Sequence, residues 1–328
     1  MNPRVSVLLP LHNCEAYLPE TLESLSSQSF EDFEVIAVND GSSDKTGEIL
    51  DRHAQKDKRF KPIHTPNGGI VKALNLALLH ALGEYCARMD GDDIAHTDRF
   101  LEQVKFLDSN PDCVCVGSLY RIINEEGVLV GEQAPFAAFR QTDLKVFPPH
   151  VGALPHPSIM LRTASLVDVG GYRHHFPHAE DQDMFLRLSQ LGRLDIIQKH
   201  LIDYRIHGSS LSSKNVDVQC ESALNALLSA LAVFEGRSDP FNGVAVNRDE
   251  ILMLHPDKNF PRLFKHLRNV RYIEARINRQ DRSIANRMTI YSLAVLLRDF
   301  FNHFHDKRYF GLIKANLRIL IRLALRRV

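Results

Sequence analysis

The first hundred residues alternate between short apolar runs and segments with helical spacing, and this alternation restricts the chain to few folds. Apolar runs predict strands at Arg4–Pro10, Phe33–Asn39, Phe60–His64 and Glu84–Met89. Helices are predicted to follow them at Glu15–Gln28, Asp44–Gln55, Ile70–Leu82 and Asp98–Leu107. Strands that are separated by single helices form right-handed crossovers, so the sequence predicts an α/β fold with a mainly parallel central sheet.

The pattern changes after Pro111, where shorter strands are predicted. These strands are Cys113–Ser118, Leu119–Ile123, Val128–Val130, Ser158–Leu161, Leu194–Ile197 and Ile202–Ile206, and one helix is predicted at Asp181–Leu191. From about Asn215 the apolar spacing is helical to the end of the chain. We therefore expect two domains, with the sheet in residues 1–214 and a helical C-terminal region in residues 215–328.

Composition argues for an ordinary soluble protein with an uneven charge distribution. Apolar residues make up 44% and charged residues 24%, and 40 basic residues balance 40 acidic ones. Residues 262–328 nevertheless hold 16 Lys and Arg against 4 Asp and Glu. A basic C-terminal region invites a polyanionic surface as a partner.

The cysteines and the apolar runs indicate the compartment. There are 5 cysteines and no Cys-x-x-Cys pair, which disfavours a disulfide framework and a zinc ribbon and favours a reducing compartment, the cytoplasm. Cys113 and Cys115 alternate in an apolar run, so we expect both in the core on one face of a strand. The N-terminal residues do not predict a signal peptide, and no apolar stretch reaches the roughly 18 residues of a spanning helix.

Polar residues follow each of the first four predicted strands. The segments are Pro10–Glu15, Asn39–Asp44, Thr65–Gly69 and Asp90–Asp93. Turns and helix caps favour the same residue types, so any one segment also fits a simple turn. Ligands of open parallel sheets, however, bind at the carboxyl ends of the strands. No Walker A motif and no Gly-x-Gly-x-x-Gly follows the first strand, which disfavours an ATPase or a nicotinamide dehydrogenase.

The segment after the fourth strand carries more charge than a turn needs. Asp90, Asp92 and Asp93 place three carboxylates within four residues, and these repel each other. Such crowding is typical of a site where a hard divalent cation takes oxygen ligands. The sequence therefore predicts Mg²⁺ or Mn²⁺ as a cofactor.

Six segments occur in a characteristic order. They are Val5–Pro10 with His12-Asn13, Val38–Asp44, Asn67–Gly69, Met89–Asp93, His178–Asp183 and Tyr204–His207. Together they resemble the family 2 glycosyltransferases of GT-A fold, over roughly residues 3–212. The resemblance implies a GT-A type nucleotide-sugar-binding domain and an inverting enzyme. Processive members carry a Gln-x-x-Arg-Trp motif and membrane spans, whereas this chain has no Trp, which implies a non-processive enzyme that adds one sugar.

The resemblance also implies residues that bind the donor. Pro10 and His12 would lie beside the nucleotide base, and Asp40 would accept a hydrogen bond from the uracil N–H. Asn67 and Gly68 would complete the nucleotide-sugar site. Asn39 stands where many relatives have a second acid, so Asp40 alone is expected to read the base.

The same resemblance implies the metal ligands and the base. Asp92 would bind the metal directly, Asp90 would lie by the ribose and the metal, and His207 would contact the metal or a phosphate. Asp181 would be the general base, and Glu180 would support it or touch the acceptor. Two carboxylates also suit a helix N-terminus, and His207 also fits an ordinary packed or surface histidine.

These features predict an inverting, metal-dependent glycosyltransferase. It would move one sugar from a nucleotide sugar, with UDP as the expected nucleotide, to a hydroxyl of a glycan or lipid-linked acceptor in cell-surface polysaccharide synthesis. The alternatives are a nucleotidyltransferase of related fold and a non-catalytic nucleotide-binding scaffold. A nucleotidyltransferase usually has a Gly-rich basic loop after the first strand, which His12–Glu15 is not.

The C-terminal segment Arg308–Val328 carries a cationic stripe. Lys314, Arg318, Arg322 and Arg326 recur every four residues among apolar side chains. This pattern fits a basic amphipathic helix on the anionic inner face of the cell membrane, and it equally fits a helix packed on the body with a solvated stripe. Nucleic acid is not expected as a partner, because aromatic residues are not interleaved with the charges.

Vesicle binding separates the two interpretations of residues 308–328. If the segment lies on a membrane, the protein should co-sediment with anionic vesicles and not with neutral ones, since each basic residue contributes about 1 kcal/mol near an anionic surface. Salt should weaken the binding, and deletion of 308–328 should abolish it without loss of turnover on a water-soluble acceptor. A protein that ignores vesicles and melts at a lower temperature after the deletion would contradict the membrane interpretation.

Overall fold

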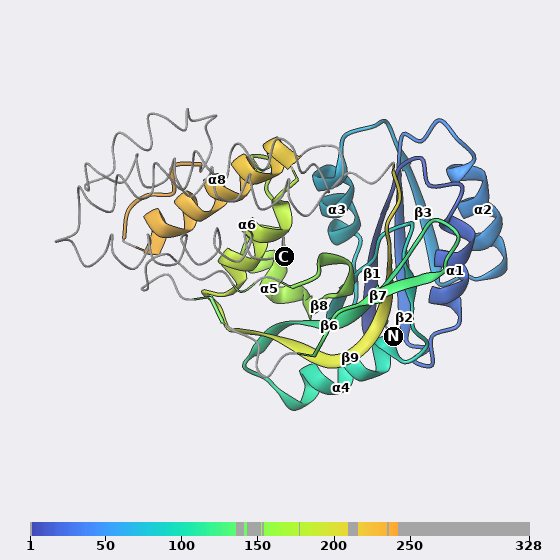
Figure 1. Ribbon diagram of the computed structural model, residues 1–328, viewed down its shortest axis with the longest axis horizontal. Coiled ribbons are helices and arrows are strands. Elements are labelled where there is room, and N and C mark those ends of the chain that lie inside the picture. The colour runs from blue at the N-terminus through green and yellow to red at the C-terminus, as the bar shows by residue number, and fades with distance from the viewer. Residues whose placement is uncertain are drawn as a thin grey trace, which may run out of the picture. The chain divides into compact units, whose positions relative to one another are not determined.

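The computed structural model describes residues 2–135, 141–142, 152, 154–176, 178–208, 216–234 and 236–241 (Figure 1). The chain divides into two compact units. The first unit contains residues 1–141, 152–174 and 180–210, and the second contains residues 142–151, 175–179 and 211–328. In the second unit, helix α8 spans Val216–Phe234. The basic segment 308–328 lies outside the described residues.

The first unit is built on one sheet with the order β3-β2-β1-β4-β8-β6-β9-β5, and β7 pairs with β6. The strands are β1 Val5–Leu11, β2 Phe33–Asp40, β3 Phe60–Thr65, β4 Tyr85–Arg88, β5 Ile94–Ala95, β6 Cys113–Ile123, β7 Leu129–Glu132, β8 Met160–Arg162 and β9 Arg193–Arg205. Strands β3, β2, β1 and β4 are parallel, as are β6 and β9. The predicted α/β class with a mainly parallel central sheet is confirmed, and β5, β7 and β8 add antiparallel pairings.

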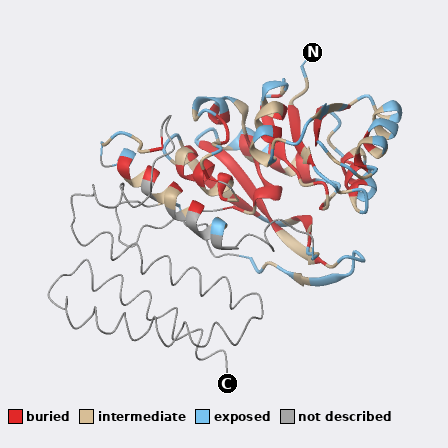
Figure 2. Ribbon diagram, turned by 90° about the horizontal axis from the view of Figure 1, so that it is seen from above, coloured by how far each residue is buried: buried red, intermediate tan, exposed pale blue. Residues whose placement is uncertain are grey.

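Helices cover both faces of this sheet (Figure 1). They are α1 Leu18–Ser26, α2 Thr46–Lys56, α3 Ile70–Leu79, α4 Arg99–Ser109, α5 Thr163–Asp168 and α6 Glu180–Leu188, with a short 3₁₀ turn at His156–Ser158. One apolar cluster joins Val5, Val7 and Leu9 of β1 to α1, α2 and α4, and a second joins Leu8 to α3, α5 and α6. Successive residues of a strand face opposite sides, so β1 is buried on both faces, which explains its continuous apolar sequence. Figure 2 shows the central strands mostly in red, the colour of buried residues.

Two strands are longer than the sequence predicted. The segments Cys113–Ser118 and Leu119–Ile123 form the single strand β6, and the two predicted strands between Leu194 and Ile206 form the single strand β9. Strands β6 and β9 stay paired along their length through register shifts, which a period-of-two pattern does not reveal. One shift lies between Cys113 and Cys115, and the two buried cysteines belong to different core clusters. The prediction that both face one side was therefore wrong.

Helices α1 and α2 each begin at least two residues later than predicted. Helix α1 starts at Leu18 instead of Glu15, and α2 starts at Thr46 instead of Asp44. The Asp44 carboxylate accepts a hydrogen bond at 3.0 Å from the N–H of Thr46, the first residue of α2. The strand β5 and the helix α5 were not predicted, because they are too short to produce a periodic pattern. Among the described residues, no helix is long and apolar enough to cross a membrane.

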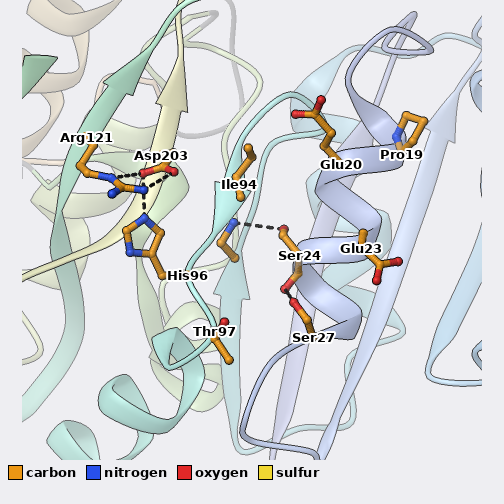
Figure 3. Close-up of a pocket in the computed structure, with 11 residues that line it drawn as sticks. Pro19, Glu20, Glu23, Ser24, Ser27, Ile94, His96, Thr97, Arg121 and Asp203 are labelled. Atoms are coloured by element: carbon orange, nitrogen blue, oxygen red, sulfur yellow. Dashed lines mark hydrogen bonds and ion pairs between the residues drawn. The ribbon is translucent and has the colours of Figure 1, made fainter. Parts of the chain in front are cut away.

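A hydrogen-bonded cluster joins β6, β9 and the residue after β5. The carboxylate of Asp203 accepts hydrogen bonds from His96 Nε2 at 2.7 Å and from Arg121 Nε and Nη2 at 2.6 Å each (Figure 3). Burial alone would raise the pKa of Asp203, but these hydrogen bonds outweigh it and hold the pKa at about 2. The charged carboxylate therefore stabilises the fold.

Replacing Asp203 with Asn should lower the free energy of unfolding by about 1 to 2 kcal/mol at pH 7, because Arg121 loses its charged partner. The difference in free energy of unfolding between wild type and Asp203→Asn is fully present above the ordinary Asp pKa of about 3.9 and is lost as pH falls toward about 2. This difference should therefore be smaller at acidic pH than at pH 7. Urea unfolding of both proteins at pH 7 and pH 3 measures this difference. Asp112→Asn, which breaks the more exposed pair with Arg193, is the control, and its free energy of unfolding should stay near that of wild type.

Candidate active site

The loops that follow β1 and β2 are hydrogen-bonded to each other. The Asn13 N–H donates to Ser42 Oγ at 3.0 Å, and Asn13 Oδ1 accepts from the Ser43 N–H at 2.8 Å. The Cys14 N–H donates to Thr46 Oγ1 at 2.9 Å. Asn13 takes the left-handed conformation, with φ of 49°, which Asn tolerates better than most residues. The first two polar segments predicted from the sequence therefore form one continuous edge.

The carboxylate of Asp40 anchors the third loop to the second. Asp40 is 5% exposed, and its two oxygens accept hydrogen bonds from the N–H groups of Gly68 and Gly69 at 2.7 and 2.8 Å. At Gly41, φ is +64° and an added Cβ would lie 2.4 Å from the Asn67 main-chain nitrogen. Only glycine permits both this conformation and this approach. Asp40, Asn67 and Gly68 thus lie close together.

The His12 ring lies against the same loop. Its Nδ1 is 2.8 Å from the main-chain oxygen of Asp40, which assigns the proton to Nδ1. Its Nε2 then accepts from Asn13 Nδ2 at 3.2 Å and faces Asn67 Nδ2 at 3.4 Å. Pro10 lies near the end of β1, paired with Val38 of β2. These five of the six residues predicted to bind the donor therefore lie at the carboxyl ends of neighbouring strands.

Asn39 has a structural role that the sequence did not reveal. Its side-chain Nδ2 is 3.0 Å from His64 Nδ1, and His64 Nε2 is 3.0 Å from Asp51 Oδ1. The Asn39 Oδ1 accepts a hydrogen bond from the Ser42 N–H at 3.3 Å. An amide can donate and accept at once, whereas an ionised carboxylate only accepts. This double role explains why Asn39 occupies the position before Asp40.

Three carboxylates crowd together after β4. Oxygen atoms of Asp90, Asp92 and Asp93 lie within 4.8 Å of one another. Asp90 forms an ion pair with Arg88, and Asp92 Oδ2 is 2.8 Å from His207 Nε2. Asp93 is fully buried, and its Oδ2 has no hydrogen-bond partner among the described residues. These residues fit a divalent cation, because they offer hard oxygen donors and one donor is left unpaired.

Burial and mutual repulsion shift the acidity of this cluster. Burial, with the charges of Asp92 and Asp90, raises the pKa of Asp93 well above its usual value. Burial also raises the pKa of Asp90, with the Asp92 charge adding to the effect and the Arg88 guanidinium opposing it. Asp90 and Asp93 are therefore costly to ionise in this cluster, and a nearby positive charge relieves that cost.

Glu180 and Asp181 begin helix α6 and lie close enough to the acidic cluster to interact with it. The charge of Asp181 is one cause of the raised pKa of Asp90. Glu180 is 6% exposed, and burial and then the Asp181 charge raise its pKa to about 7. Burial raises the pKa of Asp181 as well. The fold thus brings together carboxylates that are about 90 positions apart in the sequence.

Three buried arginines near the cluster were missed by the sequence analysis. Arg88 pairs with Asp90, and Arg99 donates from Nη2 to the main-chain oxygen of Arg88 at 2.6 Å. Burial lowers the pKa of Arg99 to about 9. Arg205 donates from Nε to the main-chain oxygen of Asp92 at 2.9 Å. An arginine inside an apolar run, as in Tyr85–Met89, is the signal that could have revealed the first of them.

A separate surface groove lies along α1. Its volume is about 840 Å³, and Figure 3 shows Glu20, Glu23 and Ser24 of α1 on one side and Arg121 and Asp203 on the other. None of the residues predicted from the sequence to form the site lines this groove. The candidate active site is therefore the acidic cluster at the strand ends and not this groove.

Comparisons with known proteins find relatives over most of the chain. The sequence model of the family described as "Glycosyl transferase family 2" matches residues 6–168. An uncharacterized glycosyltransferase of Haemophilus influenzae is 33% identical over 234 residues, which cover 67% of this chain and 71% of that protein. A chondroitin synthase of Pasteurella multocida is 28% identical over 252 residues. The match covers 76% of this chain but spans only 26% of that synthase.

Solved structures share the fold. TarS 1-349 of S. aureus, in complex with UDP-GlcNAc, has a TM-score of 0.59 at 19% identity, and the match covers 98% of this chain and 92% of that chain. The mannosyltransferase PcManGT of Pyrobaculum calidifontis, in complex with GDP-Man and Mn2+, has a TM-score of 0.56 at 17% identity, covering 99% of this chain and 87% of that chain. These similarities support the GT-A type of α/β fold.

Replacing Asp92 with Ala should weaken Mn²⁺ binding by at least about tenfold, because the cluster loses a carboxylate and His207 loses the hydrogen-bond partner that orients it. Titration of the protein with Mn²⁺, followed by the electron paramagnetic resonance signal of the free ion, measures the affinity. Asp112→Ala removes an exposed carboxylate and serves as the control. An unchanged affinity in a folded Asp92→Ala variant would remove Asp92 from the metal site.

Proposed function

Because the chain belongs to glycosyltransferase family 2, we propose that it is an inverting, metal-dependent enzyme that transfers one sugar from a nucleotide sugar to an acceptor hydroxyl. The observation that carries this proposal is the meeting of two groups of carboxylates in the first unit. Asp90, Asp92 and Asp93 follow β4, and Asp181 interacts with them electrostatically from the start of α6. One group suits a diphosphate-bound cation, and the other suits a base.

UDP is the proposed nucleotide. Both oxygens of Asp40 already accept one main-chain N–H each, and each keeps a second lone pair that can accept the uracil N–H. His12 and Gly68 contact Asp40, and Pro10 and Asn67 would complete the nucleotide site. The TarS complex with UDP-GlcNAc, which shares the fold, supports a uridine donor.

Asp92, Asp90 and His207 would hold Mn²⁺ or Mg²⁺. When bound, the cation supplies positive charge that stabilises the departing nucleoside diphosphate. The unpaired Oδ2 of Asp93 and the raised pKa of Asp90 support the presence of such a charge. PcManGT, which shares the fold, was solved with Mn2+.

Asp181 is the proposed general base. Its carboxylate would take the proton of the acceptor hydroxyl as that oxygen attacks the anomeric carbon, while the bond from this carbon to the diphosphate oxygen breaks. Burial raises the pKa of Asp181, which makes its carboxylate a better proton acceptor. The buried Glu180 beside it would support Asp181 or contact the acceptor. A single in-line displacement inverts the anomeric configuration.

A glycan or lipid-linked acceptor in cell-surface polysaccharide synthesis is proposed. The chondroitin and hyaluronan synthases among the relatives support a polysaccharide context, although this chain spans 26% and 22% of the two from Pasteurella multocida. Residues 1–214 would form the catalytic domain. Residues 308–328 would place the enzyme peripherally on the inner face of the cell membrane. No nucleic acid partner is proposed.

The family assignment decides between the enzyme classes that the sequence left open. The chain is a glycosyltransferase and not a nucleotidyltransferase, since both the family model and the named relatives are glycosyltransferases. The scaffold alternative predicts no metal-dependent UDP binding, so calorimetric titration with UDP and Mn²⁺ tests it.

Nucleoside diphosphate release from a panel of nucleotide sugars should identify the donor. We expect turnover with a UDP-sugar in the presence of Mn²⁺ or Mg²⁺, loss of turnover in excess chelator and recovery when the metal is restored.

Asp181→Asn keeps the side-chain shape but cannot take a proton, so it should lower turnover at least about 10²-fold with donor affinity nearly unchanged. Asp168→Asn, an exposed carboxylate on α5, is the control.

Three outcomes would contradict the proposal. Undiminished turnover in excess chelator would exclude metal dependence. Loss of donor binding in Asp181→Asn, together with loss of turnover, would make Asp181 structural. A product that retains the donor's anomeric configuration would exclude a single displacement.

A further inference from the structure

The side chain of Arg205, at the end of β9, contacts three separate segments of the chain. Arg205 is 2% exposed. Its Nε donates to the main-chain oxygen of Asp92 at 2.9 Å, and its Nη2 pairs with Glu20 Oε2 of α1 at 2.5 Å. Its Nη1 donates to the main-chain oxygens of Asn124 and Glu125, at 3.2 Å each, in the turn between β6 and β7. The guanidinium therefore joins the acidic loop to a helix and to a hairpin.

Further contacts tie Arg205 and its neighbours to the acidic loop. The Arg205 N–H donates to Asp93 Oδ1 at 2.8 Å, and His207 Nε2 is 2.8 Å from Asp92 Oδ2. With the bond from Arg205 Nε, three hydrogen bonds connect residues 92–93 with residues 205–207. The side chain of Arg205 bonds the main chain of Asp92, so it leaves the Asp92 carboxylate for other ligands.

Tyr17 extends this arrangement to the His207 ring. The Arg205 guanidinium carbon lies 4.7 Å from the centre of the Tyr17 ring. The Tyr17 ring centre lies 4.9 Å from that of His207, with the planes at 48°. Tyr17 thus packs against both side chains, and a shift of Arg205 would move the surface on which the His207 ring rests.

We propose that Arg205 is a positioning residue that holds Asp92 and His207 in the arrangement that binds the divalent cation. The inference rests on the proposed function. Three like charges after β4 repel each other, so the loop needs attachments that do not occupy its metal-facing oxygens. Arg205 supplies such an attachment, because its planar fork of donors reaches main-chain oxygens in several directions at once. The single ammonium of a lysine cannot reproduce this geometry.

Arg205→Lys keeps the charge and removes the fork, so it isolates the positioning role. We expect Mn²⁺ alone, titrated and followed by electron paramagnetic resonance, to bind this variant at least about tenfold more weakly than wild type, the usual effect of losing a partner that orients metal ligands. Arg193→Lys, at the opposite end of the same strand, is the matched control and should keep wild-type Mn²⁺ affinity. Its carboxylate partners are the exposed Asp112 and the half-buried Asp195, and neither belongs to the acidic cluster.

Turnover gives a second readout that general destabilisation would not move. In Arg205→Lys, the Mn²⁺ concentration for half-maximal turnover should rise by about the same tenfold factor, and excess Mn²⁺ should restore most of the rate. Thermal unfolding of each variant verifies that it is folded. A folded Arg205→Lys with wild-type Mn²⁺ affinity overturns the inference.

A second variant keeps the inference testable if Arg205→Lys does not fold. Tyr17→Leu removes the ring between Arg205 and His207 and should also weaken Mn²⁺ binding measurably, whereas unchanged binding would overturn the inference. A wild-type protein that binds Mn²⁺ but turns over no nucleotide sugar refutes the proposed function alone. A wild-type protein that binds no Mn²⁺ refutes both.

Discussion

Repulsion among the carboxylates that follow β4 is the constraint around which the first unit is arranged. Oxygen atoms of Asp90, Asp92 and Asp93 lie within 4.8 Å of one another, and burial makes the charges of Asp90 and Asp93 more costly. Two buried arginines oppose that cost: Arg88 pairs directly with Asp90, and the charge of Arg205 is placed against the Asp92 main chain. The central sheet, the end of β9 and the start of α1 are thus joined at one place, which is also the place where chemistry is proposed.

The alternation of strands and helices was sufficient to predict the first half of the fold. Strands β1 and β2 are buried on both faces, so their apolar runs are continuous and their limits are clear. The second half was harder, because β6 and β9 pair through register shifts and carry polar residues such as Arg121 and Asp203. The short strand β5 exists only through its pairing with β9, which no local pattern records.

The candidate site was predictable where residues are adjacent in sequence and less so where the fold joins distant segments. The crowding of Asp90, Asp92 and Asp93 is visible in the sequence because it violates what a turn requires. The roles of Asn39 and Arg205 are not, since both depend on partners far along the chain, such as His64 and Glu20. Polar groups that satisfy buried main-chain atoms carry no local signature, and only the fold reveals them.

The hairpin between β6 and β7 has a consequence for how this surface can change. Arg205 contacts the tip through the main-chain oxygens of Asn124 and Glu125, which every residue type possesses. The turn depends on Gly127, whose φ of +77° other residues rarely adopt. The exposed Glu126 side chain at the tip is therefore open to replacement without loss of this attachment, whereas Asn124 Oδ1 and Glu125 Oε1 accept the N–H groups of Val128 and Gly208. That part of the turn can therefore vary in sequence while the acidic loop stays anchored through Arg205.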